Sequence, residues 1–395
     1  MTDWQELESK YFIQISPRTP ITIVKGEGAR VWDDSGKEYL DFVGGWAVNS
    51  LGHCPKVVAD ALNEQARTLI QTSNQYYTVP QIKLAQLLVE NSCLDRVYVC
   101  NSGTEANEGA VKLARRYGSL KLNGAYEVIT TTNSFHGRTL AMTAATGQEK
   151  FQKPYIPLPN GFKTVAYNDV EAIKAATTDK TCAVMLEPIQ GEGGVNIPAD
   201  DYLLNVRQWC DEKGILLILD EIQTGIGRLG TLFGYEQYGV EPDIMTLAKG
   251  LGSGVPVGAF MAKDSCAVFA AGEHGSTFGG NALTSAAAYA TVKYVIDNDI
   301  PGNVKRVGQY LMDGLKKLKD KYSFVTEVRG RGLLVAMEFD SDIGAEVLTA
   351  CLEKGLLVNR VKPNAIRLIP PLIIGNKEVD QALGILDEVL SSIGK

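Results

Sequence analysis

Gly214-Ile215-Leu216-Leu217-Ile218-Leu219-Asp220-Glu221 is a continuous apolar run that ends in two carboxylates, and it is typical of one class of fold. A strand carries such a run when both of its faces are buried, which is typical of a parallel sheet covered by helices. In open α/β sheets, ligands bind outside the carboxyl ends of the parallel strands, which is where Asp220 falls. The run therefore predicts a fold class and also the edge of the sheet where a site is expected.

Further runs on either side extend this pattern into an α/β architecture. From about residue 55 to residue 290, helical segments alternate with strand-like runs, which are Val97–Cys100, Glu127–Thr131, Ala183–Glu187, Ile215–Asp220 and Ile244–Leu247. This alternation predicts a mostly parallel sheet covered by helices. Later segments differ, with a long helical pattern at Val304–Lys319 and strands at Leu333–Glu338 and Ile366–Ile369. We expect a large domain (55–290) and a smaller α+β domain, formed by an N-terminal segment (1–54) and the C-terminal residues (291–395).

The stretch Asp243-Ile244-Met245-Thr246-Leu247-Ala248-Lys249-Gly250-Leu251-Gly252 places one lysine at the end of a strand-like run, directly before glycines. A lysine held where water is scarce has a lowered pKa and can form a Schiff base with an aldehyde. The glycines allow unusual backbone turns and let a bulky planar ligand come close. The alternative is a strand that ends at the surface with Lys249 on its tip.

Asp220 favours the first of these alternatives. A carboxylate at the end of its strand would keep a pyridine nitrogen protonated, and a protonated pyridine is the electron sink of pyridoxal phosphate chemistry. The competing interpretation is a magnesium-binding acidic pair behind a phosphate-binding loop. That interpretation requires the pattern G-x-x-x-x-G-K-[ST], which does not occur in the chain.

A phosphate site is expected at Asn101-Ser102-Gly103-Thr104, which follows a short strand and opens a helical stretch to about Tyr117. Backbone N–H groups at a helix start, together with the helix dipole and hydroxyls, form an anion site. Ser102 and Glu105 also have the spacing of a capping box, which many helices use without a ligand. The segment by itself leaves both interpretations open, and its combination with Lys249 and Asp220 favours phosphate binding.

Five strings resemble the class III (ω-amino) pyridoxal phosphate aminotransferases in order and spacing. They are Asn101–Asn107, Ser134–Thr139, Leu186–Glu192, Asp220–Gln223 and Ser276–Asn281, with Ala248-Lys249-Gly250 in the expected place. The resemblance spans the chain from about Gly28 onward and implies a fold-type I enzyme with a large and a small domain. Within the family, Ser73–Tyr77 and Phe135–Arg138 resemble the enzymes that act on N-acetylornithine.

The resemblance implies a role for each residue of a pyridoxal phosphate site. Lys249 would form the Schiff base and, once displaced by substrate, act as the general base, while Asp220 would pair with the pyridinium nitrogen. Gln223 would hydrogen-bond near the phenolic oxygen of the cofactor, and Phe135 would stack on its ring. The phosphate would be held by Ser102, Gly103 and Thr104, and by Thr277 from the partner subunit of a homodimer.

Substrate recognition is expected to rest on two arginines, because a guanidinium grips a carboxylate with two parallel hydrogen bonds. Arg138 resembles the arginine that takes the distal carboxylate of acetylornithine or 2-oxoglutarate, and Arg367 the arginine for the α-carboxylate of glutamate. Without the resemblance, the alternating pattern around Arg367 favours a solvent-facing position. Glu192 resembles the residue that neutralises Arg367 when the substrate has no carboxylate at that end. Ser276 is expected in the same pocket.

Trp46 departs from the resemblance. Acetylornithine enzymes usually carry an aliphatic residue at this position, and ornithine aminotransferase carries a tyrosine. A large ring here would line the pocket entrance and change which ω-amine fits, or it would be a core or dimer-contact tryptophan.

Composition excludes several other classes of function. The net charge of −7 argues against nucleic acid or an anionic membrane as the main partner. The longest apolar runs are far shorter than the roughly 20 residues of a membrane helix. The 7 cysteines are scattered and the 3 histidines too few for a histidine-rich centre, so we expect no metal and a reducing compartment. Residues 1–10 carry no targeting signal, and we expect a cytoplasmic protein.

The resemblance thus implies transfer of the ω-amino group of N-acetylornithine to 2-oxoglutarate, giving N-acetylglutamate 5-semialdehyde and glutamate, in arginine biosynthesis. Related activities on ornithine, succinylornithine, 4-aminobutyrate or a carrier-linked lysine precursor remain open, because the sequence does not give the size of the pocket. A pyridoxal phosphate-binding regulator without turnover has no use for a selector such as Glu192. An aminomutase needs no 2-oxoglutarate site.

Overall fold

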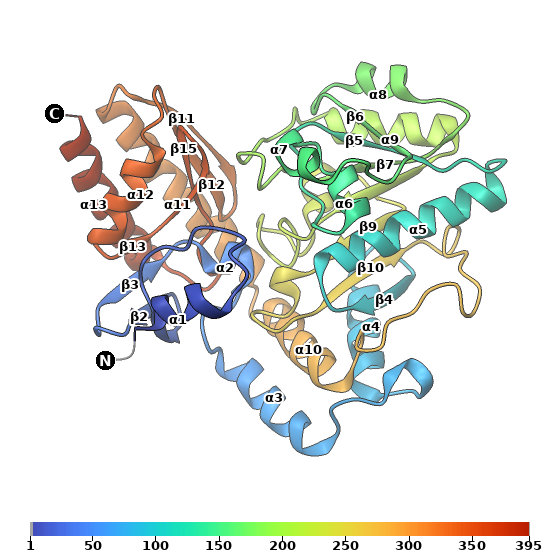
Figure 1. Cartoon of the computed structure of the whole chain (residues 1–395), viewed down its shortest axis with the longest axis horizontal. Coiled ribbons are helices and arrows are strands. Elements are labelled where there is room, and N and C mark those ends of the chain that lie inside the picture. Colours follow the sequence, from blue (N-terminus) through green and yellow to red (C-terminus); the bar gives the residue numbers. More distant parts are fainter. Residues whose placement is uncertain (1–2, 395) are drawn as a thin grey trace.

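The computed structural model describes residues 3–394, and Figure 1 shows a large sheet covered by helices beside two smaller sheets. The large sheet has the order β4-β10-β9-β8-β7-β5-β6. From β9 to β6 all neighbouring strands are parallel, whereas β10 is antiparallel to both of its neighbours. The predicted α/β class with a mostly parallel sheet is therefore confirmed. The strands are β4 (Arg96–Cys100), β5 (Glu127–Thr131), β6 (Phe162–Val165), β7 (Thr181–Leu186), β8 (Leu216–Asp220), β9 (Ile244–Leu247) and β10 (Gly258–Ala262).

Strand β8 lies in the middle of this sheet and is buried at every residue. Leu217 and Leu219 pack into one apolar cluster with residues of α9 (Tyr202–Lys213), whereas Leu216 and Ile218 pack into another with residues of α5 (Gly103–Lys121). Successive side chains of a strand point to opposite faces, so an unbroken apolar run fills both clusters. Each such side chain stabilises the fold by about 1.5–3 kcal/mol relative to an exposed position.

The two smaller sheets bring the ends of the chain together. One has the order β1-β2-β3-β13, in which β13 (Leu356–Leu357) pairs in parallel with β3 (Glu38–Asp41). The other, called here the C-terminal sheet, has the order β11-β12-β15-β14. The domain boundaries near residues 54 and 290 stay predictions. The remaining strands are β1 (Ile23–Glu27), β2 (Arg30–Asp33), β11 (Val325–Arg331), β12 (Leu334–Phe339), β14 (Asn359–Lys362) and β15 (Ala365–Leu368).

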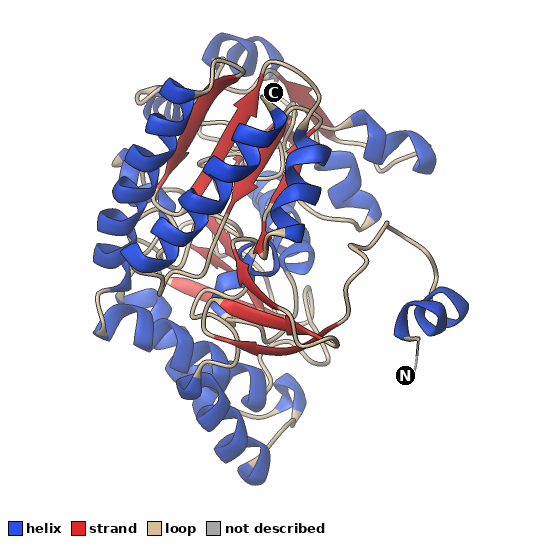
Figure 2. Ribbon diagram, turned by 90° about the vertical axis from the view of Figure 1, so that its left-hand side faces the viewer, coloured by secondary structure: helices blue, strands red, loops and turns tan. Residues whose placement is uncertain are grey.

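Helices cover these sheets and connect their strands. The first of them stands away from the body of the molecule in Figure 2, and none of its residues is buried. The helices not yet named are α1 (Trp4–Tyr11), α2 (Gly44–Ala47), α3 (Lys56–Thr68), α4 (Val79–Glu90), α6 (Leu140–Ala145), α7 (Glu149–Gln152), α8 (Val170–Ala176), α10 (Ala282–Asp297), α11 (Ile300–Lys321), α12 (Gly344–Glu353), α13 (Asn376–Ile393) and the short 3₁₀ turns η1 (Ser73–Gln75), η2 (Lys153–Tyr155), η3 (Gly234–Tyr238) and η4 (Lys249–Leu251).

Candidate active site

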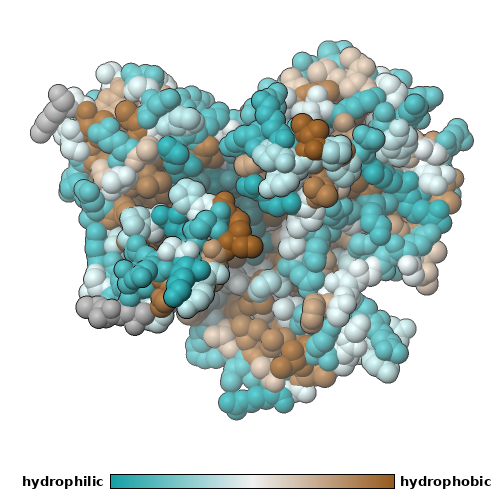
Figure 3. Space-filling view, in the orientation of Figure 1, coloured by the Kyte–Doolittle hydropathy of each residue, from teal (hydrophilic) through white to brown (hydrophobic). Residues whose placement is uncertain are grey.

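A cavity of about 420 Å³ opens where β4, β8 and β9 end. Figure 3 shows the surface hollowed between the C-terminal sheet and the large sheet. Parallel strands end at a common edge, so residues far apart in sequence converge there. Of the site residues predicted from the sequence, the following line the cavity: Ser102, Gly103, Thr104, Phe135, Arg138, Glu192, Asp220, Gln223 and Lys249.

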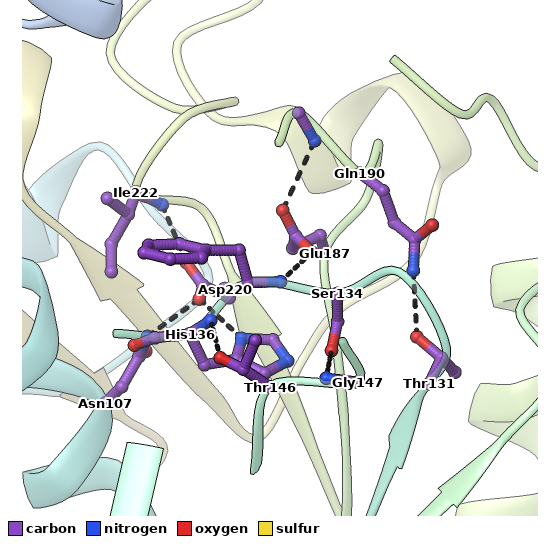
Figure 4. Close-up of polar contacts among 12 residues, drawn as sticks. Asn107, Thr131, Ser134, His136, Thr146, Gly147, Glu187, Gln190, Asp220 and Ile222 are labelled. Atoms are coloured by element: carbon purple, nitrogen blue, oxygen red, sulfur yellow. Dashed lines mark hydrogen bonds and ion pairs between the residues drawn. The ribbon is translucent and has the colours of Figure 1, made fainter. Parts of the chain in front are cut away.

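Asp220, at the end of β8, is buried and held by three donors (Figure 4). Its Oδ2 accepts hydrogen bonds from Asn107 Nδ2 at 2.7 Å and from His136 Nδ1 at 2.8 Å. Its Oδ1 accepts from the backbone N–H of Ile222 at 3.1 Å. Donors on both oxygens fix the direction of the carboxyl group. Asp220 is therefore a preorganised carboxylate in the wall of the cavity.

Glu221, the next residue, points to the other side of the strand. Its carboxylate accepts hydrogen bonds from the backbone N–H groups of Gly234 and Tyr235. Burial raises the pKa of Glu221 to about 8. Because the two neighbouring carboxylates do not converge, they do not form the acidic pair that a magnesium site requires.

Lys249 follows β9 and begins the turn η4. Its backbone has a φ of 44°, in the left-handed region that a non-glycine residue adopts only under strain. Burial lowers its pKa, and Arg367 acts in the same direction, although Glu192 and Asp220 oppose the shift. The amine is thus available as a nucleophile at a lower pH than an exposed lysine.

Helix α5 begins at the cavity with Ser102 as its N-cap. The Ser102 hydroxyl accepts from the backbone N–H of Glu105 at 3.3 Å, and the Glu105 carboxylate accepts from the N–H of Asn101 at 2.6 Å. A methyl group on Gly103 would lie 2.7 Å from Ile222 Cδ1, so the helix start needs glycine to approach the loop after β8. Ser102 therefore caps the helix, and Gly103 and Thr104 of its first turn line the cavity, where the N–H groups of a helix start can bind an anion.

Glu187 also lines the cavity, and the sequence assigned it no role. Its two carboxylate oxygens accept the backbone N–H groups of Phe135 at 3.1 Å and Gly191 at 3.3 Å. Burial raises its pKa well above the usual range, and the nearby charge of Asp220 adds to this. Glu187 joins the loop after β5 to the loop after β7, and so it fixes the position of Phe135.

Arg138 lies at the exposed side of the cavity. Its guanidinium carbon is 4.0 Å from the centroid of the Phe151 ring and 5.5 Å from that of Phe135. Within residues 3–394 it has no carboxylate partner at ion-pair distance. Stacking on an aromatic face holds a guanidinium in place while leaving its N–H donors free for a ligand.

Arg367, on β15 of the C-terminal sheet, is fully buried, so the solvent-facing alternative is wrong. Its Nη1 lies 2.9 Å from Glu192 Oε1 and donates to Gln223 Oε1 at 2.9 Å. Gln223 Nε2 in turn donates to Glu192 Oε1 at 3.0 Å. We call these three residues the gate. Asn359 supports it from the next strand, accepting from Arg367 Nη2 at 2.7 Å.

Charge in the gate is balanced by Glu192. Burial alone would raise the pKa of this carboxyl group, but Arg367 and Lys249 outweigh it and lower the pKa to about 2. Glu192 is therefore ionised at neutral pH and neutralises the buried Arg367.

Thr277 and Ser276 lie outside the cavity lining of their own chain. Thr277 is exposed, and its carbonyl accepts a hydrogen bond from Gln71. Ser276 Oγ accepts from Asn101 Nδ2 at 3.1 Å, so it sits behind a residue that does line the cavity. Their predicted roles stay predictions.

Trp46 lies in α2, where all four residues have positive φ: Gly44 at 53°, Gly45 at 61°, Trp46 at 60° and Ala47 at 69°. This left-handed turn is strained at its two non-glycine residues. The Trp46 side chain is 57% exposed, so the core alternative is wrong. Val48, two residues later, lines the cavity, which places the turn beside the cavity wall.

Comparison with known proteins agrees with this geometry. The model of the family described as aminotransferase class-III matches residues 12–390. The chain belongs to the class III aminotransferases. It is 53% identical to the acetylornithine aminotransferase of Caldanaerobacter subterraneus subsp. tengcongensis over 98% of each chain. It is 50% identical to the acetylornithine aminotransferase of Methanocaldococcus jannaschii over 100% of this chain and 99% of that protein.

Solved structures of this family share the fold. The ornithine aminotransferase of Toxoplasma gondii superposes with a TM-score of 0.96 at 36% identity, covering 99% of this chain and 95% of that one. The N-acetylornithine aminotransferase of Stenotrophomonas maltophilia superposes with a TM-score of 0.85 at 36% identity, covering 98% of each chain. The chain is therefore an aminotransferase with the fold-type I architecture of its class.

The donors in the cavity match the cofactor of this family, pyridoxal phosphate. Asp220 offers a buried anion for a pyridinium nitrogen, Lys249 an amine of lowered pKa for an aldehyde, and the start of α5 an anion site for a phosphate. Nothing in residues 3–394 forms a group of three or more His, Cys, Asp or Glu side chains suited to a metal. In the same range, each helix is too short or too polar to cross a membrane.

Proposed function

We propose that this aminotransferase moves the ω-amino group of N2-acetyl-L-ornithine to 2-oxoglutarate, as a step of arginine biosynthesis in the cytoplasm. One observation carries the proposal: a single cavity is lined by Lys249, by Arg138, which has no carboxylate partner within residues 3–394, and by Glu192, which neutralises the buried Arg367. The relatives that are 53% and 50% identical to this chain bear the name acetylornithine aminotransferase. Identity at that level over whole chains supports the same substrate.

Residues at the start of α5 and at the end of β8 would hold pyridoxal phosphate. Gly103 and Thr104, with Ser102 beside them, would donate backbone N–H groups to its phosphate, Asp220 would pair with its ring nitrogen, and Phe135 would cover the ring. Gln223 would hydrogen-bond near its phenolic oxygen. When bound, the cofactor supplies an electron sink for the negative charge that develops at the substrate carbon.

Lys249 has two tasks in the proposed reaction. It would bind the aldehyde of the cofactor as a Schiff base, and once displaced by substrate its free amine would act as the general base at the substrate carbon. Its lowered pKa suits both tasks, because each requires the unprotonated amine. Asp220 keeps its direction throughout, since its three donors hold both of its oxygens.

The gate explains how one cavity accepts two amino donors. Acetylornithine has no carboxylate on its reacting carbon, so Glu192 keeps its ion pair with Arg367 and Arg138 takes the distal carboxylate. Glutamate has one on its reacting carbon, which displaces Glu192 and binds Arg367, while its other carboxylate binds Arg138. A guanidinium suits both exchanges because it grips a carboxylate with two parallel hydrogen bonds.

Ornithine is the second candidate donor. The superposition on the ornithine aminotransferase of Toxoplasma gondii and the aromatic residue at Trp46 favour it. Ornithine would also need a side chain of the cavity to pair with its free α-amino group.

A homodimer is part of the proposal. Large apolar side chains are exposed where residues 70–82 meet residues 276–283, and apolar residues gather low in Figure 3 near α3 and α10. They are Ile70, Tyr76, Tyr77, Val79, Ile82 and Phe278. Such a patch is typical of an interface. In the proposed homodimer, Thr277, which is exposed at the edge of this patch, would join the phosphate site of the second copy. Light scattering behind a sizing column tests this, and a monomer would refute it.

The near-visible absorbance of the protein loaded with pyridoxal phosphate tests the donor. N-acetylornithine, ornithine and 4-aminobutyrate are each added without 2-oxoglutarate, and the decay of the long-wavelength band is followed. We expect the fastest decay with N-acetylornithine. Faster decay with ornithine would keep the chemistry and change the substrate, and the absence of any band would refute the proposed role of Lys249.

A further inference from the structure

We propose that Gln223 and Gly191 set the preference between the two amino donors, by holding the gate closed. The inference rests on the proposed function, because it assumes that one donor displaces Glu192 from Arg367 and the other does not. Gln223 is a specificity-determining residue in this view, and Gly191 is the position that makes room for it.

Gln223 contacts both charged members of the gate at once. Its amide oxygen accepts from Arg367 Nη1 at 2.9 Å, and its amide nitrogen donates to Glu192 Oε1 at 3.0 Å. Its exposed fraction is only 8%, so water does not readily replace these bonds. The bond from the amide nitrogen exists only while Glu192 faces Arg367. Gln223 therefore stabilises the closed state more than the open one.

Gly191 leaves the space that the Gln223 amide occupies. A methyl group on Gly191 would lie 1.5 Å from Gln223 Oε1 and 2.5 Å from its Cδ. No side chain fits there while Gln223 keeps its position. The φ of Gly191 is not in the left-handed region, so alanine is compatible with the backbone. Its N–H, which donates to Glu187, is retained in alanine. Gly191→Ala thus acts on the gate by moving Gln223, and it removes no polar group.

The two donors respond differently to such a change. A donor with a carboxylate on its reacting carbon must open the gate, so the loss of the Gln223 hydrogen bonds offsets part of its binding energy. A donor without that carboxylate binds the closed state, in which these hydrogen bonds are kept. Weakening Gln223 therefore favours glutamate over N-acetylornithine, and it does so through the donor concentration needed rather than through the maximal rate.

The test measures the donor half-reaction of the loaded enzyme against concentration, separately for glutamate and N-acetylornithine. The variants are Gly191→Ala and Gln223→Leu. The matched control is Gly384→Ala, which adds the same methyl group on α13 where nothing lies within 4 Å. We expect the ratio of half-saturating concentrations, glutamate over N-acetylornithine, to fall by about 10- to 150-fold in both variants, as the loss of one hydrogen bond to a charged group predicts. The control keeps the wild-type ratio.

Separate outcomes refute the inference and the proposed function. If the wild-type protein reacts with neither donor, the proposed function fails. If it reacts with both and the ratio in Gly191→Ala and Gln223→Leu equals that of the control, Gln223 does not set the preference. An equal loss of rate with both donors would assign Gln223 to the cofactor alone and also overturn the inference. Should Gly191→Ala fail to fold, Gln223→Leu decides by itself.

Discussion

The two ends of the cavity are built differently. At the cofactor end, every charged group comes from the large sheet or from segments that leave its strands. At the gate, a residue of the C-terminal sheet contacts two residues of the large-sheet loops. Asp220 and Lys249 follow neighbouring parallel strands. Arg367 reaches Glu192 and Gln223 from β15. The first arrangement lies within one layer, and the second joins two sheets.

This difference separates a fixed charge from an exchangeable one. Asp220 is held by three donors, and each is buried or belongs to the backbone, so its direction has no alternative. Arg367 is neutralised by Glu192, whose side chain is 29% exposed and belongs to a loop. A substrate carboxylate can replace that partner without leaving a buried charge unpaired. The groups that react with both donors thus lie on the large sheet. The groups that select between the donors lie where the large sheet and the C-terminal sheet meet.

At the cofactor end, Lys249→Ala should cause the greatest loss of activity. Proton transfer by a positioned amine contributes roughly 10²–10⁴-fold to the rate, and the attachment of the cofactor is lost as well, so we expect no measurable transamination. The melting temperature should stay close to that of the wild-type protein, because the change removes no core packing. Steady-state assays and circular dichroism measure both, and near-normal activity would contradict the role of Lys249.

Asp220→Asn should lower the maximal rate by about 10²–10³-fold with either donor, since it removes a preorganised charge. His136 and Asn107 would hold the amide oxygen and turn its NH₂ group toward the ring nitrogen, which then has no anion to keep it protonated. The affinity for pyridoxal phosphate, measured by fluorescence quenching, should fall in parallel. Glu221→Gln is the control, because that carboxylate points away from the cavity, and it should lower stability rather than rate.

Arg138→Ala tests the residue that both donors and 2-oxoglutarate share. Losing two hydrogen bonds to a carboxylate should raise the Michaelis constants for N-acetylornithine and 2-oxoglutarate by about 10- to 100-fold. Arg138→Lys should recover part of the loss, because it restores the charge without the planar fork. Unchanged Michaelis constants for both compounds would remove Arg138 from the site.

Glu192→Gln should have the smallest effect on rate and a measurable one on stability, about 1–3 kcal/mol at pH 7, because it leaves Arg367 buried with a neutral partner. The folded-state pKa of Glu192 is lowered from 4.5 to about 2, so its ionised form stabilises the fold above pH 4.5. That contribution is lost as the pH falls toward 2.

Melting temperatures of the wild-type protein and Glu192→Gln should therefore converge as the pH falls below 4.5. Glu149→Gln, which breaks an exposed ion pair with Lys153, should change stability little at either pH. A constant gap between wild type and Glu192→Gln from pH 7 to pH 3 would show that the ion pair with Arg367 does not stabilise the fold.

The strands of the large sheet could largely be predicted from the sequence. Strands β5 and β9 have the predicted bounds, and β8 differs by one residue, because long apolar runs between turn residues leave few alternatives. Strands β6 and β10 were missed. The first has only four residues and none of them is buried, so it forms no long apolar run, and the second contains a glycine and two alanines, which are depleted in strands.

Within the site, the amino-acid sequence alone was enough to select as candidates the groups that stand at the ends of recognisable strands and helices, such as Asp220, Lys249 and Ser102. It gave no role to His136 and Asn107, which contact Asp220 from positions 84 and 113 residues away. Nor did it show that Arg367 is buried or that Gln223 links it to Glu192. Local patterns encode burial and direction along one element. Which side chains meet across two sheets depends on how those sheets pack, and only the folded chain decides that.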